Sequence, residues 1–352
     1  MPIRFDISCL CGTVAQSLTA RPPPGHDPSK PIPITICHCN TCRQTSGVLC
    51  TSYCPIERPD DDKLDLLTVY TSSPGTERYF CKTCGCHVIR RRQSSAEDDG
   101  DLWEVATGVI ADERRDDDDN TENDNDTPVL EYVRHEHVDD TGDGGLAVWM
   151  PTVGDRTMDG YEEPQLTADT VDSTTPTAWT VSASCHCGAV QFDIRPPDYD
   201  LAASRHPHSA FADLLVPYAT TDPAITANPE DVKWWLRPSQ DDQTKTTRWL
   251  AGTCACRSCR LATGFEIQTW TFVPRICIMV KGEPLTFNNG GNSNGNTPPK
   301  LSAYESSHGV ERNFCNCCGA TVFWHDVWRP DLIDISKQHE VAMDRVHDED
   351  RS

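Results

Sequence analysis

Cysteine spacing constrains the fold of this chain more than any other feature of its sequence. Three short elements follow one another: a C-x-C-G turn at residues 8–12, a C-x-C-x-x-C-R stretch at 37–47 and a C-x-x-C-G turn at 79–85. The same three elements recur in the same order at residues 184–188, 254–264 and 314–319. An ordered repeat of this kind predicts two tandem homologous domains with the same cysteine framework.

The spacers between the elements vary while the elements do not. Matching cysteines are 176 residues apart in the first element, 217 in the second and 234 in the third (Cys9 to Cys185, Cys37 to Cys254, Cys81 to Cys315). The second copy therefore has 41 additional residues (217 less 176) before its middle element and 17 more (234 less 217) before its last. Both additions are loop-like, at residues 206–248 and 288–296.

The repeat sets the expected domain limits. We predict the first domain at residues 1–154, with an acidic loop at about 111–127. A linker rich in Thr, Asp, Glu and Pro follows at 155–177, and the second domain occupies 178–352. The second domain bears the insertions, and only about 17 residues follow Ile335, so we expect this copy to be incomplete.

The chain has 19 cysteines, an odd number, and no apolar run follows Met1. The two cysteines of a C-x-C turn bridge poorly to each other, so we expect reduced thiolates on metal rather than disulfides. This indicates a cytoplasmic location, or a nuclear one. No stretch approaches the ~20 apolar residues of a membrane-spanning helix, and no membrane partner is expected.

The net charge of −23 is concentrated in one region. Residues 97–126 hold 14 acidic side chains against Arg114 and Arg115, which accounts for −12 of the total. Nucleic-acid binding depends on Lys and Arg side chains that neutralise phosphates. The composition therefore argues against a nucleic-acid partner.

The ends of the elements suggest how the sulfurs are shared between metal sites. The outer two elements of each set end in Gly, whereas the middle one continues into Arg. We predict that the outer elements form one closed four-cysteine site per domain, which joins the two ends of the domain as a structural zinc does. The predicted ligands are Cys9, Cys11, Cys81 and Cys84 in the first domain, and Cys185, Cys187, Cys315 and Cys318 in the second.

The middle element then stands apart, with three cysteines and no fourth ligand of its own. These cysteines are Cys37, Cys39 and Cys42 in the first domain, and Cys254, Cys256 and Cys259 in the second. A catalytic zinc keeps one position open, so the stretch predicts an open site unless a distant Cys or His closes it. Arg43 is a candidate contact for a substrate carboxylate. Its alternative role is that of a surface arginine that balances the thiolates.

The expected metal is zinc, with two ions per domain and four per chain. Iron or an iron–sulfur cluster is less suited to C-x-C and C-x-x-C-G brackets at long separation. We interpret His38 and His186, each present in one copy only, as polar fillers rather than ligands. No role is predicted for Cys50, Cys54, Cys86, Cys277 and Cys317.

Between the cysteine elements the sequence is mostly strand-like. Short β-branched or aromatic segments occur at residues 32–36, 66–70, 87–90, 103–107, 268–272, 276–280 and 321–324. Only residues 210–216 and 230–236 favour a helix. We predict a mainly β fold of two tandem zinc-stabilised domains, each made of small packed antiparallel sheets.

The motifs SCLCG, CHCNTCRQTSG and FCKTCG resemble the family of glutathione-dependent formaldehyde-activating enzymes, which also includes centromere protein V. The resemblance extends over most of residues 1–150 and about 180–336, and residues 133–149 look like the closing segment of the family. It implies a β-tent fold with a four-cysteine structural zinc and a three-cysteine zinc open to substrate.

The resemblance also implies an activity of the carbon–sulfur lyase type. A small thiol such as glutathione would add reversibly to an aldehyde such as formaldehyde, giving S-hydroxymethylglutathione. Cys37, Cys39 and Cys42 would hold the open zinc, and the first domain is the expected active one. The alternative is a non-catalytic tandem zinc module that binds another protein through Trp234, Trp235 and Trp249, although we expect these tryptophans to be core residues.

Overall fold

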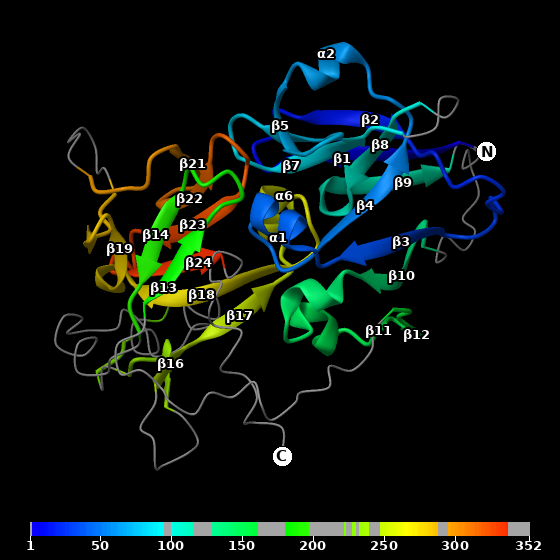
Figure 1. Ribbon diagram of the computed structural model, residues 1–352. Helices are drawn as coiled ribbons and strands as arrows, with labels where there is room; N and C mark the ends of the chain where they lie inside the picture. The colour runs from blue at the N-terminus through cyan, green and yellow to red at the C-terminus, as the bar shows by residue number, and fades with distance from the viewer. Residues whose placement is uncertain are drawn as a thin grey trace.

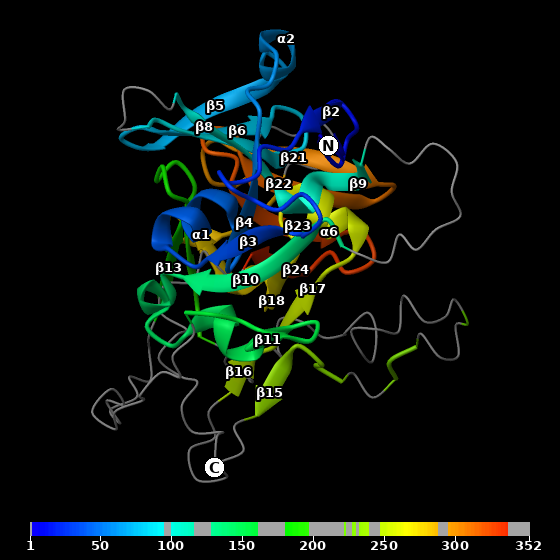
Figure 2. The same cartoon turned by 90° about the vertical axis from the view of Figure 1, so that its right-hand side faces the viewer.

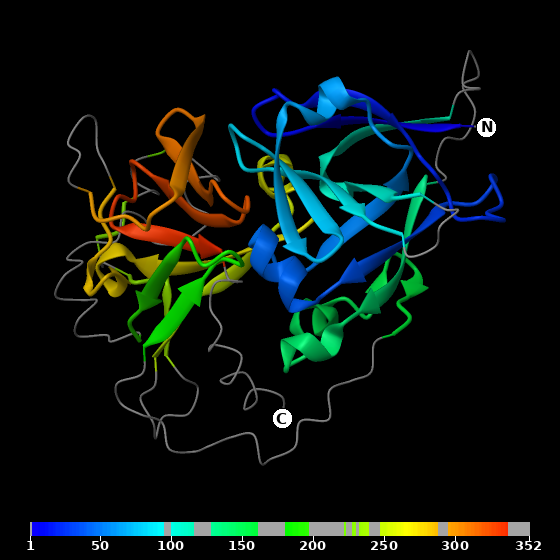
Figure 3. The same ribbon diagram turned by 45° about the horizontal axis from the view of Figure 1, so that its top comes forward.

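The computed structural model describes residues 2–94, 100–115, 128–160, 180–196, 222, 227–229, 232–238, 247–287 and 295–336. Its strands gather into two groups, and the short helices α1 (Asn40–Ser46) and α6 (Arg257–Thr263) lie where the groups meet (Figures 1 and 3). We call residues 2–160 the N-terminal half and residues 180–336 the C-terminal half. Strands dominate both halves, so the predicted mainly β class is confirmed.

The N-terminal half contains a seven-stranded sheet in the order β10-β3-β4-β8-β7-β6-β5 and a three-stranded sheet in the order β2-β1-β9. The strands are β1 (Ile3–Ser8), β2 (Ala15–Thr19), β3 (Ile32–Cys37), β4 (Thr51–Ile56), β5 (Leu67–Ser73), β6 (Thr76–Cys81), β7 (His87–Arg92), β8 (Leu102–Ala106), β9 (Ile110–Arg115) and β10 (Leu130–Glu136). Shorter elements are α2 (Asp61–Leu64), three 3-10 turns (Thr107–Val109, Val138–Thr141, Gly145–Trp149) and the hairpin β11 (Thr152–Val153) and β12 (Arg156–Thr157).

The C-terminal half contains a six-stranded sheet in the order β17-β18-β24-β23-β22-β21, a four-stranded sheet in the order β13-β14-β19-β20, and the pair β15-β16. The elements are β13 (Val181–Ser184), β14 (Gln191–Ile194), β15 (Leu236–Pro238), β16 (Thr247–Trp249), β17 (Ala251–Cys254), β18 (Gln268–Pro274), a 3-10 turn (Arg275–Cys277), β19 (Ile278–Val280), β20 (Glu283–Pro284), β21 (Leu301–Ser307), β22 (Val310–Cys315), β23 (Thr321–Asp326) and β24 (Leu332–Ser336).

The two large sheets share their local irregularities. The β5–β6 hairpin shifts register between Thr71 and Ser73, and the β21–β22 hairpin shifts between Glu305 and Ser307, which are the residues 234 positions further on. The register of the next strand pair also shifts in each sheet: just before Phe80 in the β6–β7 pair, and just before Phe314 in the β22–β23 pair. A β-bulge is a specific feature of a strand pair. Shared bulges therefore extend the likeness of the halves from the cysteines to the strands.

One strand pairing differs from the expected antiparallel sheets. β10 pairs with β3 in the parallel direction, and Figure 2 shows the two strands side by side. All the other neighbouring strands in the described sheets pair in the antiparallel direction. In the described part of the C-terminal half, β17 has only β18 beside it.

The helix predictions need correction. The described part of segment 230–236 contains a turn and the start of β15 rather than a helix, because Trp234 and Trp235 pack into the core as part of a strand hairpin. The helices that do form over the middle cysteine elements, α1 and α6, were not predicted. Each has only seven residues, too few to show a clear period of 3.6 residues.

The predicted end of the first domain at residue 154 falls inside the β11–β12 hairpin. Beyond the hairpin, the N–H of Asp159 donates to the carbonyl of Val133, and the N–H of His135 donates to the carbonyl of Asp159. Met158 is buried. Residues 155–160 therefore pack with the N-terminal half rather than forming part of a linker.

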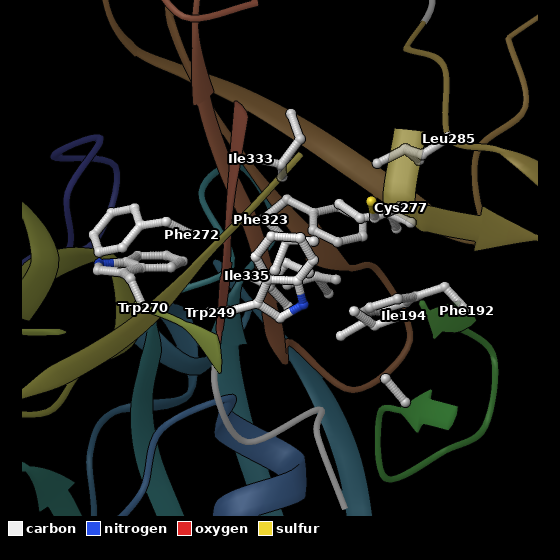
Figure 4. Close-up of a cluster of buried hydrophobic side chains, with 14 of the residues drawn as sticks. Phe192, Ile194, Trp249, Trp270, Phe272, Cys277, Leu285, Phe323, Ile333 and Ile335 are labelled. Carbon is white, nitrogen blue, oxygen red and sulfur yellow. The ribbon is translucent and has the colours of Figure 1, made fainter. Parts of the chain in front are cut away.

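Each half has its own hydrophobic core. The core of the C-terminal half includes Phe192, Phe272, Phe323 and Trp249 (Figure 4). The other two tryptophans of the insertion, Trp234 and Trp235, belong to the same core. Trp234, Trp235 and Trp249 are only 4, 3 and 5% exposed, which confirms their prediction as core residues. Buried side chains of this size each contribute about 1.5–3 kcal/mol. These three tryptophans are therefore not available to a partner protein.

Several predicted segments lie wholly or largely outside the described residues. They are the acidic loop beyond residue 115, the linker at 161–177, the helix at 210–216, most of both insertions and the segment after Ser336. Among the residues that are described, none of the helices has the length and apolar character required to cross a membrane.

Candidate metal centres

The outer cysteine elements of each set come together in space, as predicted. Cys11 Sγ lies 3.4 Å from Cys9 Sγ and 3.5 Å from Cys81 Sγ, and Cys84 completes the group. In the C-terminal half, Cys187 Sγ lies 3.4 Å from Cys185 Sγ and 3.6 Å from Cys315 Sγ, and Cys318 completes the group. We call these groups the first and the second four-cysteine cluster.

The backbone of the turns is shaped around the sulfurs. The N–H of Val14 donates to Cys9 Sγ, and the N–H of Val190 donates to Cys185 Sγ, both at 3.4 Å. In the C-x-x-C-G turns, Gly85 and Gly319 have φ values of 78° and 79°. Only glycine adopts this left-handed conformation without strain. The glycine at the end of each turn therefore allows the chain to fold back over the sulfurs.

The donor sets fit zinc. The four sulfurs of each cluster lie within 4.8 Å of one another. A tetrahedral zinc with Zn–S distances of about 2.3 Å places its ligands about 3.8 Å apart, close to the separations found. Four mutually close thiols without a disulfide are the arrangement that a structural zinc stabilises.

The middle cysteine element places its three sulfurs at the start of a short helix. Cys37 ends β3, Cys39 is the N-cap of α1, and the N–H of Cys42 donates to Cys39 Sγ at 3.3 Å. The C-terminal half repeats this arrangement, with Cys256 as the N-cap of α6 and the N–H of Cys259 donating to its sulfur at 3.4 Å. A thiolate suits this position, because the positive end of a helix dipole favours negative charge.

The sulfurs of Cys37, Cys39 and Cys42, like those of Cys254, Cys256 and Cys259, also lie within 4.8 Å of one another. We call these groups the first and the second three-cysteine cluster. Among the described residues, no fourth histidine, cysteine or carboxylate lies within that distance of all three sulfurs in either group. The four groups are those that the sequence predicted, and each could hold a metal ion.

A buried arginine contacts the first three-cysteine cluster. Arg78, only 2% exposed, donates from Nη2 to Cys42 Sγ at 3.2 Å, from Nη1 to the Tyr53 hydroxyl at 2.9 Å and from Nε to Ser72 Oγ at 3.0 Å. Burial lowers the pKa of Arg78, but Tyr53 and Cys42 outweigh it, and the net shift is upward. Arg78 therefore stays positively charged beside the sulfurs.

Arg312 occupies the same place in the C-terminal half, where Nη2 and Nη1 lie 3.6 and 3.8 Å from Cys259 Sγ. The sequence analysis missed both arginines. Each stands three residues before the first cysteine of the C-x-x-C-G turn, so the repeat contained the signal. The contact with the helix could not be inferred because it joins residues 36 positions apart in one half and 53 in the other.

Further charged side chains lie next to the residues that Arg78 contacts. Arg90 lies over the Tyr53 ring at 4.0 Å and forms a bidentate pair with Glu104 at 2.7 and 2.9 Å, and Arg92 forms a second bidentate pair with the same carboxylate. Burial alone would raise the pKa of Glu104, but the two guanidinium groups hold it below its usual value. In the C-terminal half, Trp270 and Trp324 stand where Tyr53 and Arg90 stand, so this arrangement is absent there.

Arg43, the predicted substrate contact, is held within the protein. It is 6% exposed, and its Nη2 donates to Asn40 Oδ1 at 2.6 Å and to the Asp140 carbonyl at 2.9 Å. It is therefore not the surface arginine that the alternative described. These contacts fix α1 to the segment after β10.

That segment covers one side of the first three-cysteine cluster. The N–H of His38 donates to the Glu136 carbonyl at 2.9 Å, and the N–H of Asn40 donates to Asp140 Oδ2 at 3.0 Å. No described segment of the C-terminal half takes this place beside β17, and Cys256 is exposed whereas Cys39 is half-buried. The first cluster is thus the better enclosed of the two.

His38 takes part in this cover. His135 Nε2 lies 2.8 Å from the Met150 carbonyl, so it must be the donor, and His135 Nδ1 is left as the acceptor for His38 Nε2 at 2.9 Å. Burial, followed by the charges of His135 and Arg43, lowers the pKa of His38 to about 3. His38 is thus a neutral, buried side chain that is not part of the three-sulfur group.

A cavity of about 470 Å³ lies apart from the sulfurs, lined among others by Arg58, Tyr79, Arg91 and Trp103. Successive residues of a strand point to opposite faces, so Tyr79 faces away from the side on which Arg78 contacts Cys42. The cavity contains no cysteine. It is therefore not part of the three-cysteine site.

The arrangement defines a mainly β protein with paired four- and three-cysteine clusters that could hold metal. Residues 4–123 match the family described as glutathione-dependent formaldehyde-activating enzyme. This part of the chain is therefore similar to a family whose description is that of an enzyme of formaldehyde activation. The match includes all seven cysteines of the first set and ends before β10. Neither the curated proteins nor the solved structures give a match to this chain.

Proposed function

We propose that the N-terminal half catalyses the reversible addition of a small thiol, such as glutathione, to a small aldehyde, such as formaldehyde, in the manner of a carbon–sulfur lyase. The observation that carries the proposal is the first three-cysteine cluster: three sulfurs at the start of α1, no fourth ligand among the described residues, and a buried arginine on one sulfur. The family match over residues 4–123 supports the same reaction.

The residues of the chain fit this reaction. Cys37, Cys39 and Cys42 would hold the zinc ion, which would supply the positive field that favours the thiolate form of a substrate thiol. Arg78 offsets part of the negative charge of the cysteine ligands, so that another anionic sulfur can approach. The cover formed by β10 and the segment after it shields the sulfurs from one side.

We also propose that the C-terminal half is a second copy of the domain, and that each half holds one structural and one open zinc. The shared bulges, the thiol-capped helices and the arginines at Cys42 and Cys259 support this. Among the described residues, no segment covers the second open site, and Trp270 stands in the place of Tyr53, which favours the first site as the active one. The alternative function, a non-catalytic module that binds another protein, is less well supported, because the three tryptophans expected to contact the partner are buried.

The test is NMR exchange spectroscopy of glutathione and formaldehyde with the zinc-loaded protein. We expect the formation and breakdown of the adduct to be faster than with the zinc-free protein. Cys42→Ser should abolish the acceleration, and Cys259→Ser, the matched change in the C-terminal half, should retain most of it. No acceleration by the zinc-loaded protein would refute this thiol–aldehyde pair as the substrate.

A further inference from the structure

The contacts between the halves occur in matched pairs. The N–H of Leu10, in the middle of the first C-x-C turn, donates to the Leu261 carbonyl in α6 at 3.0 Å. The N–H of His186, in the middle of the second C-x-C turn, donates to the Gln44 carbonyl in α1 at 3.2 Å. Each acceptor stands two residues after the last cysteine of its three-cysteine cluster. Reciprocal contacts of this kind are those of a two-fold interface.

The ends of the two helices approach the opposite half equally closely. A Cβ atom on Gly47 would lie 2.2 Å from the Thr321 carbonyl oxygen, and one on Gly264 would lie 2.0 Å from the His87 carbonyl oxygen. Thr321 and His87 occupy the same place in β23 and β7, two residues after the C-x-x-C-G glycine. Each helix is thus clamped between a cysteine turn and a strand of the other half.

Side chains also link the two halves near the second C-x-C turn. The Tyr70 hydroxyl, from β5, lies 2.6 Å from His186 Nδ1, beside the second four-cysteine cluster. Tyr70 packs against the core of the C-terminal half, and its counterpart Tyr304 packs against the core of the N-terminal half. Each core is therefore completed by a tyrosine from the opposite half.

These contacts matter for the open sites because α1 and α6 are short. A helix of seven residues is not stable on its own, so its position depends on the packing around it. Cys39 and Cys42 lie within α1 or at its start, and Cys256 and Cys259 have the same relation to α6. Whatever holds each helix also holds two of the three sulfurs in place.

We propose that each four-cysteine turn positions the three-cysteine cluster of the opposite half, so that the halves support each other's open sites crosswise. His186 and Tyr70 are positioning residues for Cys37, Cys39 and Cys42, and Leu10 is a positioning residue for Cys254, Cys256 and Cys259. In this arrangement the C-terminal half helps to hold the first three-cysteine cluster in place, whether or not its own cluster is catalytic. This inference rests on the proposal that the clusters bind metal.

The test uses the full zinc-loaded chain, pulsed with iodoacetamide, and reads the alkylation rate of each cysteine by peptide mass spectrometry. His186→Pro removes the N–H that holds α1, and we expect alkylation of Cys37, Cys39 and Cys42 to rise about fivefold, the effect of one peptide hydrogen bond. The second three-cysteine cluster should keep its rate. Leu10→Pro is the matched variant and should show the reverse pattern.

A milder pair of variants decides the matter if a proline prevents folding. Tyr70→Phe removes only the hydroxyl at His186, and we expect about twofold faster alkylation at Cys37, Cys39 and Cys42. Tyr304→Phe should leave these three cysteines unchanged. If His186→Pro and Tyr70→Phe speed the alkylation of Cys254, Cys256 and Cys259 instead, or of both three-cysteine clusters equally, the crosswise arrangement is overturned.

The unmodified chain separates this inference from the proposed function. If zinc slows the alkylation of none of these six cysteines, the three-cysteine clusters do not bind zinc and the proposed function fails. If zinc protects them and the variants show no crossed pattern, the proposed function stands and the crosswise support is wrong.

Discussion

At the scale of single residues, the first three-cysteine cluster depends on charge. Three thiolates and one Zn²⁺ carry a net charge of −1, and Arg78 reduces the local total to zero. The guanidinium is buried and reaches Cys42, Tyr53 and Ser72 at the same time. A buried charge that loses its partner is strongly destabilising. Arg78 and the thiolates therefore depend on each other.

Replacing Arg78 should show this dependence. We expect Arg78→Leu to lower the free energy of unfolding of the zinc-loaded protein by about 3–5 kcal/mol, because the thiolate cluster is left without its buried counterion. Arg78→Lys keeps the positive charge but loses the guanidinium hydrogen bonds to Tyr53 and Ser72. We therefore expect this variant to lose less free energy of unfolding. Urea unfolding measures both.

The control for this experiment is Arg134→Leu. Arg134 is more than half exposed in its ion pair with Glu136, and such pairs contribute about 0–1 kcal/mol. Equal losses for Arg78→Leu and Arg134→Leu would mean that Arg78 does not balance the sulfurs.

His87 gives the interface between the halves a pH dependence. Its Nε2 lies 2.9 Å from the Thr45 carbonyl, and a Cβ atom on Gly319 of the other half would lie 2.9 Å from it. Burial, and then the charge of Arg78, lower the pKa of His87 to about 3, while Cys42 acts in the opposite direction. The folded pKa lies below the unfolded value of 6.5, so the contribution to stability is fully present above about pH 6.5 and is lost as the pH falls toward 3.

We expect His87 to cost about 1.4 kcal/mol of stability for each pH unit below 6.5. His87→Gln keeps an amide donor for Thr45 and does not titrate. The difference in the free energy of urea unfolding between the two proteins should therefore change by about 1 kcal/mol between pH 6.5 and 5.5, because the full slope is reached only below the unfolded pKa. Acid-induced metal release affects both proteins and cancels in the difference. A pH-independent difference would contradict the assignment.

The sequence predicts the candidate metal ligands better than their surroundings. Thiolate spacing is a local property, so Cys9, Cys37 and Cys81 could be assigned to groups directly from the sequence. Arg78 could not, because strand pairing and helix placement bring it to Cys42. Arg43 was a weaker choice for the same reason: its partner Asp140 lies 97 residues away.

At the scale of secondary-structure elements, α1 and α6 are the two pieces around which the sites form. A cysteine caps each helix at its start, and Gly47 or Gly264 ends it in the left-handed conformation. Only the signal for the helix end, a glycine after the last helical residue, is a usual one, because cysteine is not among the preferred cap residues. The two helices were overlooked because a two-turn helix gives no apolar period, whereas the strand segments show alternation that is easy to recognise.

The end of α1 provides a direct test of its close packing. Gly47 has φ of 78°, and an added Cβ would lie 2.2 Å from the Thr321 carbonyl oxygen. Gly142 has φ of 75° and no atom within 4 Å of such a Cβ. Both Gly→Ala variants incur the cost of a left-handed alanine, about 1–2 kcal/mol.

We expect Gly47→Ala to lose about 1–3 kcal/mol more than Gly142→Ala in urea unfolding, because the backbone of the other half must move away. Since Gly142 lies in the same half with nearly the same φ, the comparison isolates the contact. Equal losses in the two variants would show that the halves do not pack this closely.

At the scale of the whole molecule, the two halves contact each other through matched pairs of residues. The repeat in the sequence predicted two matching units, and the structure places equivalent residues in equivalent contacts. How the units pack could not be predicted, because the matched contacts of the two helices are made by peptide groups and glycines that look ordinary in a sequence. The parallel β10–β3 pair was not predicted for a related reason: residues 116–129, which are rich in acidic side chains, separate β10 from β9 in the sequence.

The metal content tests the two-unit arrangement. We expect four zinc ions per chain by elemental analysis, one for each sulfur group. Cys318→Ser should remove one ion from the second four-cysteine cluster, and Cys84→Ser should remove one from the first. A content of two ions in the unmodified chain would show that the three-cysteine clusters bind none.

The bonds between the cysteine turns and the helices involve main-chain atoms only. Leu10 and His186 donate equivalent bonds with unlike side chains, and so do their acceptors Leu261 and Gln44. Substitutions at these four positions can therefore change the side-chain chemistry near each open site while keeping the peptide bonds that join the halves. With the halves joined in this way, the side chains around one site can change while the main-chain contacts between the halves are kept.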